Sequence, residues 1–281
     1  MFRSLKIGRW LGIDVFVHPT FWLLPLFVVL QSGADASIAS VALDLGVMFA
    51  VFGCIALHEY GHAMAARWYG IRTRDITLYP FGGIASLERI PARPGPEIVI
   101  ALAGPAVNVA IAAVLALFTV AIGGSLSDRL SAANGFETFV LSLFYSNIAL
   151  VVFNMIPAFP MDGGRVFRAA LSYGMDRVSA TTAAVVVGSI MAALMGLVGF
   201  YSEQYMLVFI AISVFMMGRS ELAMVRQQAT YQDAVRRADG RIPVVEPTRQ
   251  QVPNDGWVFD PRTGLWTDWV NGVAVRRTRL H

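Results

Sequence analysis

Long apolar runs, separated by short polar segments, cover most of the first 222 residues of the chain. The runs extend over about residues 19–31, 38–69, 97–123, 136–156, 181–201 and 205–221. A helix needs about 20 apolar residues to cross the hydrocarbon core of a bilayer. The pattern therefore predicts an all-α polytopic membrane protein with six transmembrane helices, although the first run is short for a span and contains Pro25.

The composition agrees with a protein surrounded by lipid. The chain has 281 residues, of which 56% are hydrophobic and 15% are charged, whereas a soluble domain carries about 25% charged residues. These values exclude an ordinary soluble enzyme. We expect the lipid bilayer, and no nucleic acid, among the partners. The single cysteine, Cys54, excludes a disulfide within the chain.

Arginine and lysine residues gather in alternate loops. They lie before the first run, between the second and third runs, between the fourth and fifth runs, and after the sixth run. In chain order they are Arg3, Lys6, Arg9, Arg67, Arg72, Arg74, Arg89, Arg93, Arg165, Arg168, Arg177, Arg219 and Arg226. The other loops contain only Arg129. Because basic loops stay in the cytoplasm, both termini of this multi-pass protein of the cell membrane are predicted to be cytoplasmic. The second helix then runs inward, and its last turns lie near the cytoplasmic face.

Two polar regions flank the apolar runs. Residues 1–17 are predicted to form short amphipathic strands, with turns at Gly8 and Gly12. Residues 223–281 are predicted to form a small cytoplasmic C-terminal tail. Within it, aromatic residues flank the segment Asp260–Gly264, a pattern that predicts a β-hairpin. A lid or docking element and a tail without a regulatory role both remain open.

A His-Glu-x-x-His motif follows the apolar part of the second run without a break. Residues four apart share a helix face, so His58 and His62 can direct two imidazoles at one metal ion. Glu59 is adjacent to the first histidine, where a carboxylate can act as general base. Ionisable groups at membrane depth are costly and usually functional. The pattern is typical of zinc hydrolases, which add a third protein ligand and keep one position open.

The third ligand is expected from the segment 154–164, Asn-Met-Ile-Pro-Ala-Phe-Pro-Met-Asp-Gly-Gly, at the end of the fourth run. Two prolines end a helix and extend the chain, and two glycines allow a tight turn and close backbone approach. Asp162 is therefore expected at the same depth as His62, where its carboxylate would complete a zinc site. The alternative is that Asp162 caps a helix beginning near Gly163.

The segment 76–87 is too polar to cross a bilayer and has strand-like stretches on both sides of Pro-Phe-Gly-Gly. It predicts a membrane-associated β-hairpin close to the metal site. An open strand edge there could bind an extended peptide by β-addition, with Gly82, Gly83 and Ile84 as the candidate substrate-binding residues. A plain cytoplasmic loop is the alternative.

The motifs at residues 58–62 and 154–163 together resemble those of the site-2 protease family of intramembrane zinc metalloproteases. The segments 78–85 and 103–108 resemble the membrane-associated β segment and the third-helix motif of that family. The resemblance covers about residues 1–222. It implies that this part of the chain is an intramembrane metalloprotease domain with six helices.

The resemblance also implies roles for single residues. One Zn²⁺ ion per chain would be held by His58, His62 and Asp162, with Glu59 as the catalytic base. Asn154 would contact the substrate backbone or stabilise the oxyanion. The implied activity is a zinc-dependent endopeptidase that cleaves transmembrane segments of single-pass substrate proteins near the cytoplasmic face, in regulated intramembrane proteolysis. A homo-oligomer is compatible with the sequence.

Three polar residues near the motifs have two interpretations each. Asn108, in an apolar helix, is a candidate for binding the substrate or for joining neighbouring helices. His18 is an active-site neighbour or an anchor at the membrane interface. Cys54, one turn before His58, either approaches the metal or is a small buried residue.

The rival functions are an intramembrane metal transporter and a metal-binding membrane scaffold. A transporter predicts metal-binding positions along a route, whereas the ligands here are predicted to form one set beside a general base. A metalloprotease with a different third ligand is a further alternative, for which the acidic candidates are Glu88, Glu97 and Glu137.

Overall fold

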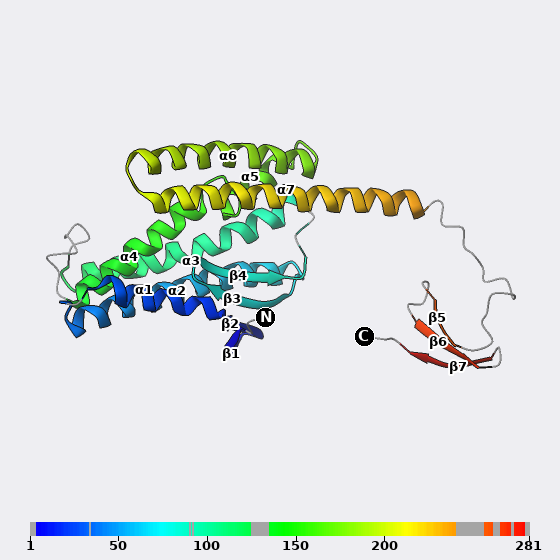
Figure 1. Ribbon diagram of the computed structural model, residues 1–281, viewed down its shortest axis with the longest axis horizontal. Helices are drawn as coiled ribbons and strands as arrows, with labels where there is room; N and C mark the ends of the chain where they lie inside the picture. The colour runs from blue at the N-terminus through cyan, green and yellow to red at the C-terminus, as the bar shows by residue number, and fades with distance from the viewer. Residues whose placement is uncertain are drawn as a thin grey trace. The chain divides into compact units, whose positions relative to one another are not determined.

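The computed structural model describes residues 4–33, 35–89, 91, 93–124, 135–239, 256–260, 265–270 and 273–278. The chain divides into two compact units, Met1–Gln227 and Gln228–His281. The first unit combines helices with a four-stranded sheet, and the second contains a three-stranded sheet (Figure 1). The predicted domain end at residue 222 lies inside the last helix.

Helices make up most of the first unit (Figure 1). They are η1 (Pro19–Trp22), α1 (Leu23–Gln31), α2 (Ile38–Trp68), α3 (Pro94–Ala121), α4 (Gly135–Asn154), α5 (Asp162–Leu171), α6 (Arg177–Tyr201) and α7 (Tyr205–Asp239). Among the described residues, five helices are long and apolar enough to cross a membrane, namely α2, α3, α4, α6 and the Tyr205–Tyr231 part of α7. Five of the six predicted runs thus coincide with such a helix.

The first apolar run differs from the span that was predicted. It forms the 3-10 helix η1 and the nine-residue α1, which together are shorter than the five long helices. Pro19 starts η1 because proline favours the first turn of a helix, where no amide hydrogen is needed. His18 caps this turn, with its ring nitrogen accepting a hydrogen bond from the Thr20 amide at 3.3 Å. The count of six spans stays a prediction.

The first unit also contains a four-stranded sheet, so the fold is mostly helical and not all-α as predicted. Its strands are β1 (Leu5–Trp10), β2 (Ile13–Val17), β3 (Thr73–Tyr79) and β4 (Gly82–Leu87). Their order in the sheet is β1-β2-β3-β4, with β2 and β3 parallel and the two outer pairs antiparallel. The predicted hairpin is therefore present as β3 and β4. It is joined to the N-terminal strands, and β4 is an edge strand.

The N-terminal hairpin turns at one of the two predicted glycines. Leu11 and Gly12 connect β1 to β2 with positive φ angles of 51° and 87°, a conformation that glycine adopts without steric cost. Gly8 lies within β1, beside a shift in the register with β2. The predicted turn at Gly8 is wrong, because glycine also serves at irregularities inside a strand.

The sheet packs on α2, the helix that carries the histidine motif. Alternate residues of β2 are buried, as expected for a strand with one face on a core. The residues that join sheet and helices form two clusters, Ile13, Val15, Ala63 and Ile76, and Val17, Phe21, Phe52 and Leu78. Burying one large aliphatic or aromatic side chain contributes about 1.5–3 kcal/mol. The clusters therefore hold β3 and β4 in place beside the motif.

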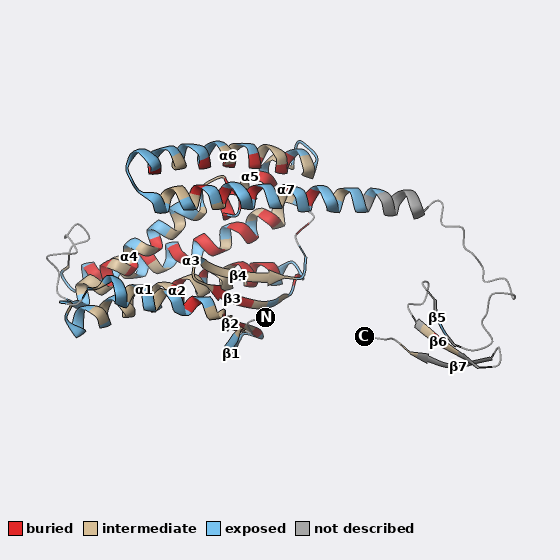
Figure 2. Cartoon of the chain, in the orientation of Figure 1, coloured by how far each residue is buried: buried red, intermediate tan, exposed pale blue. Residues whose placement is uncertain are grey.

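Helix α3 is the central helix of the first unit. It packs against α2, α4 and α5, and Figure 2 shows buried positions recurring along it. Three of these positions are polar, namely Glu97, which is 2% exposed, Asn108, which is completely buried, and Thr119. Helices α6 and α7 lie side by side (Figure 1) and share a cluster in which Ala192 meets Val214.

The second unit contains the strands β5 (Gly256–Asp260), β6 (Leu265–Val270) and β7 (Val273–Thr278), which form an antiparallel sheet in the order β5-β6-β7. Strands β5 and β6 agree with the predicted hairpin, and β7 adds a third strand that the pattern had not indicated. The turn predicted at residues 261–264 and the loop with Arg129 lie outside the described residues.

Candidate metal centre

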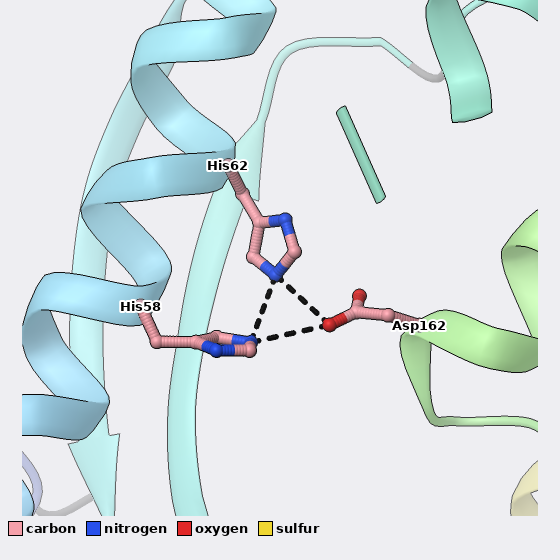
Figure 3. Close-up of side chains that lie close together, drawn as sticks. All are labelled: His58, His62 and Asp162. Atoms are coloured by element: carbon pink, nitrogen blue, oxygen red, sulfur yellow. Dashed lines mark hydrogen bonds and ion pairs between the residues drawn. The ribbon is translucent and has the colours of Figure 1, made fainter. Parts of the chain in front are cut away.

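His58 and His62 lie one turn apart on α2, and their rings converge (Figure 3). The Nε2 atoms of the two rings are 3.0 Å apart. The Oδ2 atom of Asp162, on the opposite side, lies 3.1 Å from each of them. All three side chains are buried, with 4–6% of each residue exposed. Two segments separated by about a hundred residues thus meet at one point.

The chain between α4 and α5 brings Asp162 to this point. Helix α4 ends at Asn154, and α5 begins at Asp162 after Met161, which has an extended backbone and makes no capping hydrogen bond. The capping alternative for Asp162 is not what the structure shows, because its carboxylate faces the histidines. Gly163 and Gly164 follow in the first turn of α5.

The two glycines allow this turn to approach the preceding segment closely. A Cβ atom on Gly163 would lie 2.5 Å from the Ile156 carbonyl oxygen, and one on Gly164 would lie 2.6 Å from the Ala158 carbonyl carbon. Contacts this short do not occur between real atoms, so larger residues would push α5 away. The prediction of close backbone approach is confirmed.

Hydrogen bonds determine that Nδ1 of each imidazole carries a hydrogen. The Nδ1 atom of His62 is 2.7 Å from the Ile100 carbonyl oxygen, and the Nδ1 atom of His58 is 2.7 Å from the Asn108 side-chain oxygen. These oxygens accept, so each Nδ1 must carry the hydrogen and donate it. In its neutral form each ring then presents a lone pair at Nε2, toward the other ring and toward Asp162.

The third converging atom is also an acceptor. Burial raises the pKa of the Asp162 carboxyl, and the neighbouring Arg165 guanidinium lowers it. As a carboxylate, Asp162 presents only acceptor oxygens. The other carboxylate oxygen lies 3.7 Å from Arg165 Nη1. Three acceptors that converge in a buried space repel one another unless a cation lies between them. A single proton can join two of the atoms, whereas a metal ion binds all three.

The donor set and the spacing fit zinc. Zn²⁺ prefers imidazole nitrogen and carboxylate oxygen at about 2.0–2.1 Å, and a tetrahedron with such bonds separates its ligand atoms by about 3.3 Å. The separations of 3.0–3.1 Å in this structure are close to that value. Among the residues that the structure describes, these three form the one group of histidine, cysteine or acidic side chains with metal-ligand spacing.

Gly104 of α3 provides the space for both imidazoles. A Cβ atom at this position would lie 2.6 Å from Nε2 of His58 and would overlap the His62 ring. Gly61, between the histidines on α2, lies against the same helix, because its Cβ would be 2.6 Å from the Ala103 carbonyl oxygen. The small residues allow α2 and α3 to approach closely at the level of the site.

Glu59 follows His58 on α2 and lies against the edge strand of the sheet. It is half-buried, and its side chain packs against β4, since a Cβ atom on Gly83 would lie 2.6 Å from Glu59 Cγ and 3.4 Å from Oε1. Gly82, with a φ of 140°, begins β4, and Ile84 is exposed. The three candidate substrate-binding residues are thus consecutive on the strand that adjoins the predicted base.

Asn108 makes its contacts within the protein, and its role in substrate binding stays a prediction. It is completely buried, its oxygen is the acceptor for His58, and its nitrogen donates to the Asn147 oxygen at 2.9 Å. Asn147 in turn donates to the Leu143 carbonyl oxygen at 2.8 Å. These contacts support the helix-joining interpretation, and they show in addition that Asn108 orients the ring of His58.

The remaining candidates lie apart from the three ligands. Asn147 also donates to the sulfur of Cys54 at 3.4 Å, so Cys54 is a small buried residue behind the site. His18 stacks on Tyr79 of β3 with ring centroids 4.9 Å apart. The side-chain nitrogen of Asn154 donates to the Leu150 carbonyl oxygen of its own helix at 2.9 Å. The structure does not bring Asn154 into a described contact with the ligands.

The rival third ligands are not supported. Glu97 is buried in an ion pair with Arg168, Glu88 is exposed, and Glu137 is half-buried. None of these acids joins the two histidines in the metal-ligand group that the described residues contain.

The comparisons with known proteins agree with the geometry. The family model of Peptidase family M50 matches residues 46–198. A zinc metalloprotease of Methanocaldococcus jannaschii is 32% identical over 232 residues, which cover 82% of this chain and 64% of that protein. Stage IV sporulation protein FB of Bacillus subtilis is 26% identical over 163 residues, or 57% of this chain and 49% of that protein. The chain thus spans about half to two thirds of the length of the curated relatives.

A solved structure shows the same fold. The site-2 protease from Methanocaldococcus jannaschii superposes with a TM-score of 0.56 and 30% sequence identity, over 78% of this chain and 95% of that chain. The family match includes both segments that supply the converging ligands and covers more than half of the sequence. The chain is therefore a multi-pass membrane protein that belongs to peptidase family M50, the family of the site-2 proteases.

Proposed function

We propose that this protein is a zinc-dependent endopeptidase that cleaves peptide bonds within the membrane. The observation that carries the proposal is the convergence of two imidazoles and a carboxylate at 3.0–3.1 Å, with Glu59 next to His58 in the sequence. His58, His62 and Asp162 are the proposed zinc ligands. When bound, zinc acts as a Lewis acid that polarises a substrate carbonyl and makes water a stronger acid.

Glu59 is the proposed general base. Its carboxylate takes a proton from the attacking water and returns that proton to the nitrogen of the leaving amine. The backbone of Gly83 confines the Glu59 side chain, which limits the positions that the carboxylate can occupy. A confined base is favourable because proton transfer requires a distance of about 2.6–3.2 Å.

The substrate is proposed to pair with β4. A peptide bond inside a transmembrane helix is already hydrogen-bonded, so the helix must unwind before cleavage. Strand β4 is the edge of its sheet and offers unpaired backbone groups next to Glu59. An extended substrate segment that pairs with Gly82, Gly83 and Ile84 would expose its carbonyls to the metal centre. The substrates are therefore proposed to be single-pass transmembrane proteins.

The cleavage is proposed to occur near the cytoplasmic face of the cell membrane. The histidines lie in the second half of α2, and the basic residues Arg67 and Arg72 follow closely. The positive-inside rule assigns this end of α2 to the cytoplasm, together with both termini. Water reaches a site near a membrane surface more easily than one at the centre. Processing of membrane-anchored regulators, as in regulated intramembrane proteolysis, fits this position.

Asn154 is proposed to contact the substrate backbone or the oxyanion. Its amide bonds to its own helix, and it lies half-buried at the end of α4, eight residues before Asp162. Substrate binding would have to redirect this side chain. Asn154→Ala should therefore lower the cleavage rate and leave the zinc content unchanged.

The test of the proposed function is Glu59→Gln in the full-length protein, reconstituted with a single-pass substrate protein. We expect cleavage to fall by about 10²–10⁴-fold, because the amide cannot accept the proton, and we expect one zinc ion per chain to remain. Zinc is measured by elemental analysis and cleavage by mass spectrometry of the products. Full activity of the variant, or loss of its zinc, would contradict the mechanism.

A metal transporter is the second candidate function. It would require further metal-binding positions along a route, but the described residues contain one such group. Uptake of zinc into proteoliposomes is expected to be the same with the wild type, with Glu59→Gln and with empty liposomes. A protease predicts a different result, because membrane proteomics of cells with Glu59→Gln should then reveal trapped single-pass substrates.

A further inference from the structure

A buried group of charges holds the helix that carries Asp162. Arg168, in the last turn of α5, is 1% exposed. Its Nε donates to Glu97 Oε1 at 3.0 Å, and its Nη2 donates to the same oxygen. Its Nη1 donates to Glu221 Oε1 of α7 at 2.5 Å. The guanidinium carbon also lies 4.9 Å from the centre of the Phe159 ring.

The charges in this group are balanced. Glu97 also faces Arg177 of α6, with Oε2 and Nη2 3.5 Å apart, and Arg177 Nη1 donates to the Pro91 carbonyl at 3.0 Å. Two arginines thus meet two glutamates, which joins α3, α5, α6 and α7. Burying charges costs free energy even when they are paired, so a network of this kind is weak evidence for stability alone. Its position relative to the ligands suggests another role.

Glu97 belongs to a row on α3 that contacts the metal centre. Its members are three or four residues apart and therefore share one face of the helix. They are Glu97, Ile100, Gly104 and Asn108, and all four are buried. Ile100 and Asn108 accept the hydrogen bonds that orient the two histidines, and Gly104 gives both rings their space.

The third ligand is connected to the same row through Arg168. Asp162 and Arg168 are the first and seventh residues of α5, so they are separated by about 9 Å along the helix axis. Glu97 begins the row, and Arg168 connects it to α5. A small tilt of α5 would displace the carboxylate, and a metal or catalytic site tolerates only about 0.5 Å of displacement.

We propose that Arg168 and Glu97 are positioning residues for Asp162. The pair fixes α5 on α3, so that one helix sets the geometry of all three ligands. Arg168 can do this because its planar guanidinium has donors in a rigid fork that reach Glu97 and Glu221 together, whereas the ammonium group of lysine is a single point charge. The inference rests on the proposed ligand set.

The test measures zinc affinity and ligand geometry in the purified full-length protein. Affinity is obtained by competition with a chromophoric chelator, and geometry from the absorption spectrum of the protein loaded with Co²⁺. The variants are Arg168→Lys, which keeps the charge, and the pair Glu97→Gln with Arg168→Gln, which keeps the network neutral. We expect both to bind zinc about 10-fold more weakly, the lower end of the effect of losing a direct partner of a ligand, and to change the Co²⁺ spectrum.

The matched control is Arg177→Gln, which removes an arginine from the same network on a helix that carries no ligand. Its zinc affinity should stay within about twofold of the wild type, whereas an equal loss would show a general effect of the network and overturn the proposal. Wild-type affinity and spectrum in both Arg168 variants would also overturn it. If neither variant folds, Glu221→Gln decides, because it removes one partner of Arg168 at a position whose side chain is 20% exposed. That variant must weaken zinc binding, and wild-type affinity would refute the proposal.

Asp162→Ala separates this inference from the proposed function. Retained zinc in Asp162→Ala would refute the ligand set itself. Loss of zinc there, with full zinc binding in the Arg168 variants, would refute the positioning role alone.

Discussion

At the scale of single residues, Gly104 faces the metal-directed nitrogens of both histidines, where a methyl group would overlap them. Asn108, one turn further along α3, accepts the hydrogen bond from Nδ1 of His58. Neither residue is a ligand, but each determines where a ligand can lie. Outer-shell residues of this kind orient the ligands and tune the affinity of a metal site.

Gly104→Ala is predicted to prevent normal zinc binding. The added Cβ would lie 2.6 Å from His58 Nε2 and against the His62 ring, so at least one imidazole must leave its position. We expect zinc content well below one ion per chain and loss of cleavage. Gly53→Ala on α2, where a Cβ would meet nothing within 4 Å, is the matched control and should keep both.

Asn108→Leu is predicted to weaken zinc binding by about 10- to 100-fold. Leucine leaves the Nδ1 hydrogen of His58 and the Asn147 oxygen without their partners, and each unsatisfied buried group costs about 1–3 kcal/mol. Asn108→Asp keeps an acceptor for His58 and should retain tighter binding than Asn108→Leu. Equal affinities of the two variants in a chelator competition would argue against this account.

At the scale of elements, the predicted base Glu59 belongs to helix α2 and packs against the edge strand β4. Strand β4 is held in place by β3, which packs through Ile76 on Ala63 of α2. The backbone of Gly83 lies close to the Glu59 side chain, so the strand proposed to bind the substrate adjoins the proposed catalytic carboxylate. A substrate segment that pairs with β4 would be placed relative to Glu59 by the same contact.

Gly83→Ala is predicted to lower the turnover number by about 10-fold or more, because a 1 Å displacement of a catalytic group can cost up to about 10²-fold. The new Cβ would lie 2.6 Å from Glu59 Cγ and displace the flexible carboxylate. Zinc affinity should not change, since no ligand touches Gly83 in the described contacts. A variant that keeps wild-type turnover, measured with a saturating substrate peptide, would refute the role of this contact.

The elements themselves were largely predictable, because hydrophobic runs and proline positions act locally. Helix α4 ends at Asn154, before the two prolines, as the sequence indicated. The parallel pairing of β2 with β3 was not predictable, since it joins segments far apart in the chain and leaves no local pattern. The same holds for Arg168, which the sequence presents as one more basic residue of a cytoplasmic loop. Its burial follows from Glu97 on another helix.

At the scale of the whole molecule, every residue of the candidate metal centre and of its hydrogen-bonded support lies in the unit Met1–Gln227. The second unit has its own three-stranded sheet. Whether that tail regulates substrate entry is a question that can be separated from the integrity of the metal centre.

Deleting residues 240–281 is predicted to leave zinc affinity within about twofold of the wild type, because α7 ends at Asp239 and the metal-ligand group found among the described residues lies before it. Chelator competition measures the affinity, and cleavage of a model substrate measures regulation by the tail. Loss of zinc from the shortened protein would show that the first unit depends on the second.

The separation of the ligands along the chain also sets an order of events during biosynthesis. Two imidazoles leave the ribosome about a hundred residues before the carboxylate that completes their coordination. A chain that stops after α3 has both imidazoles but no third donor, because Asp162 begins α5. With the proposed ligand set, hydrolysis therefore cannot begin before α5 has been synthesised, and neighbouring membrane proteins are spared from any precursor that ends before it.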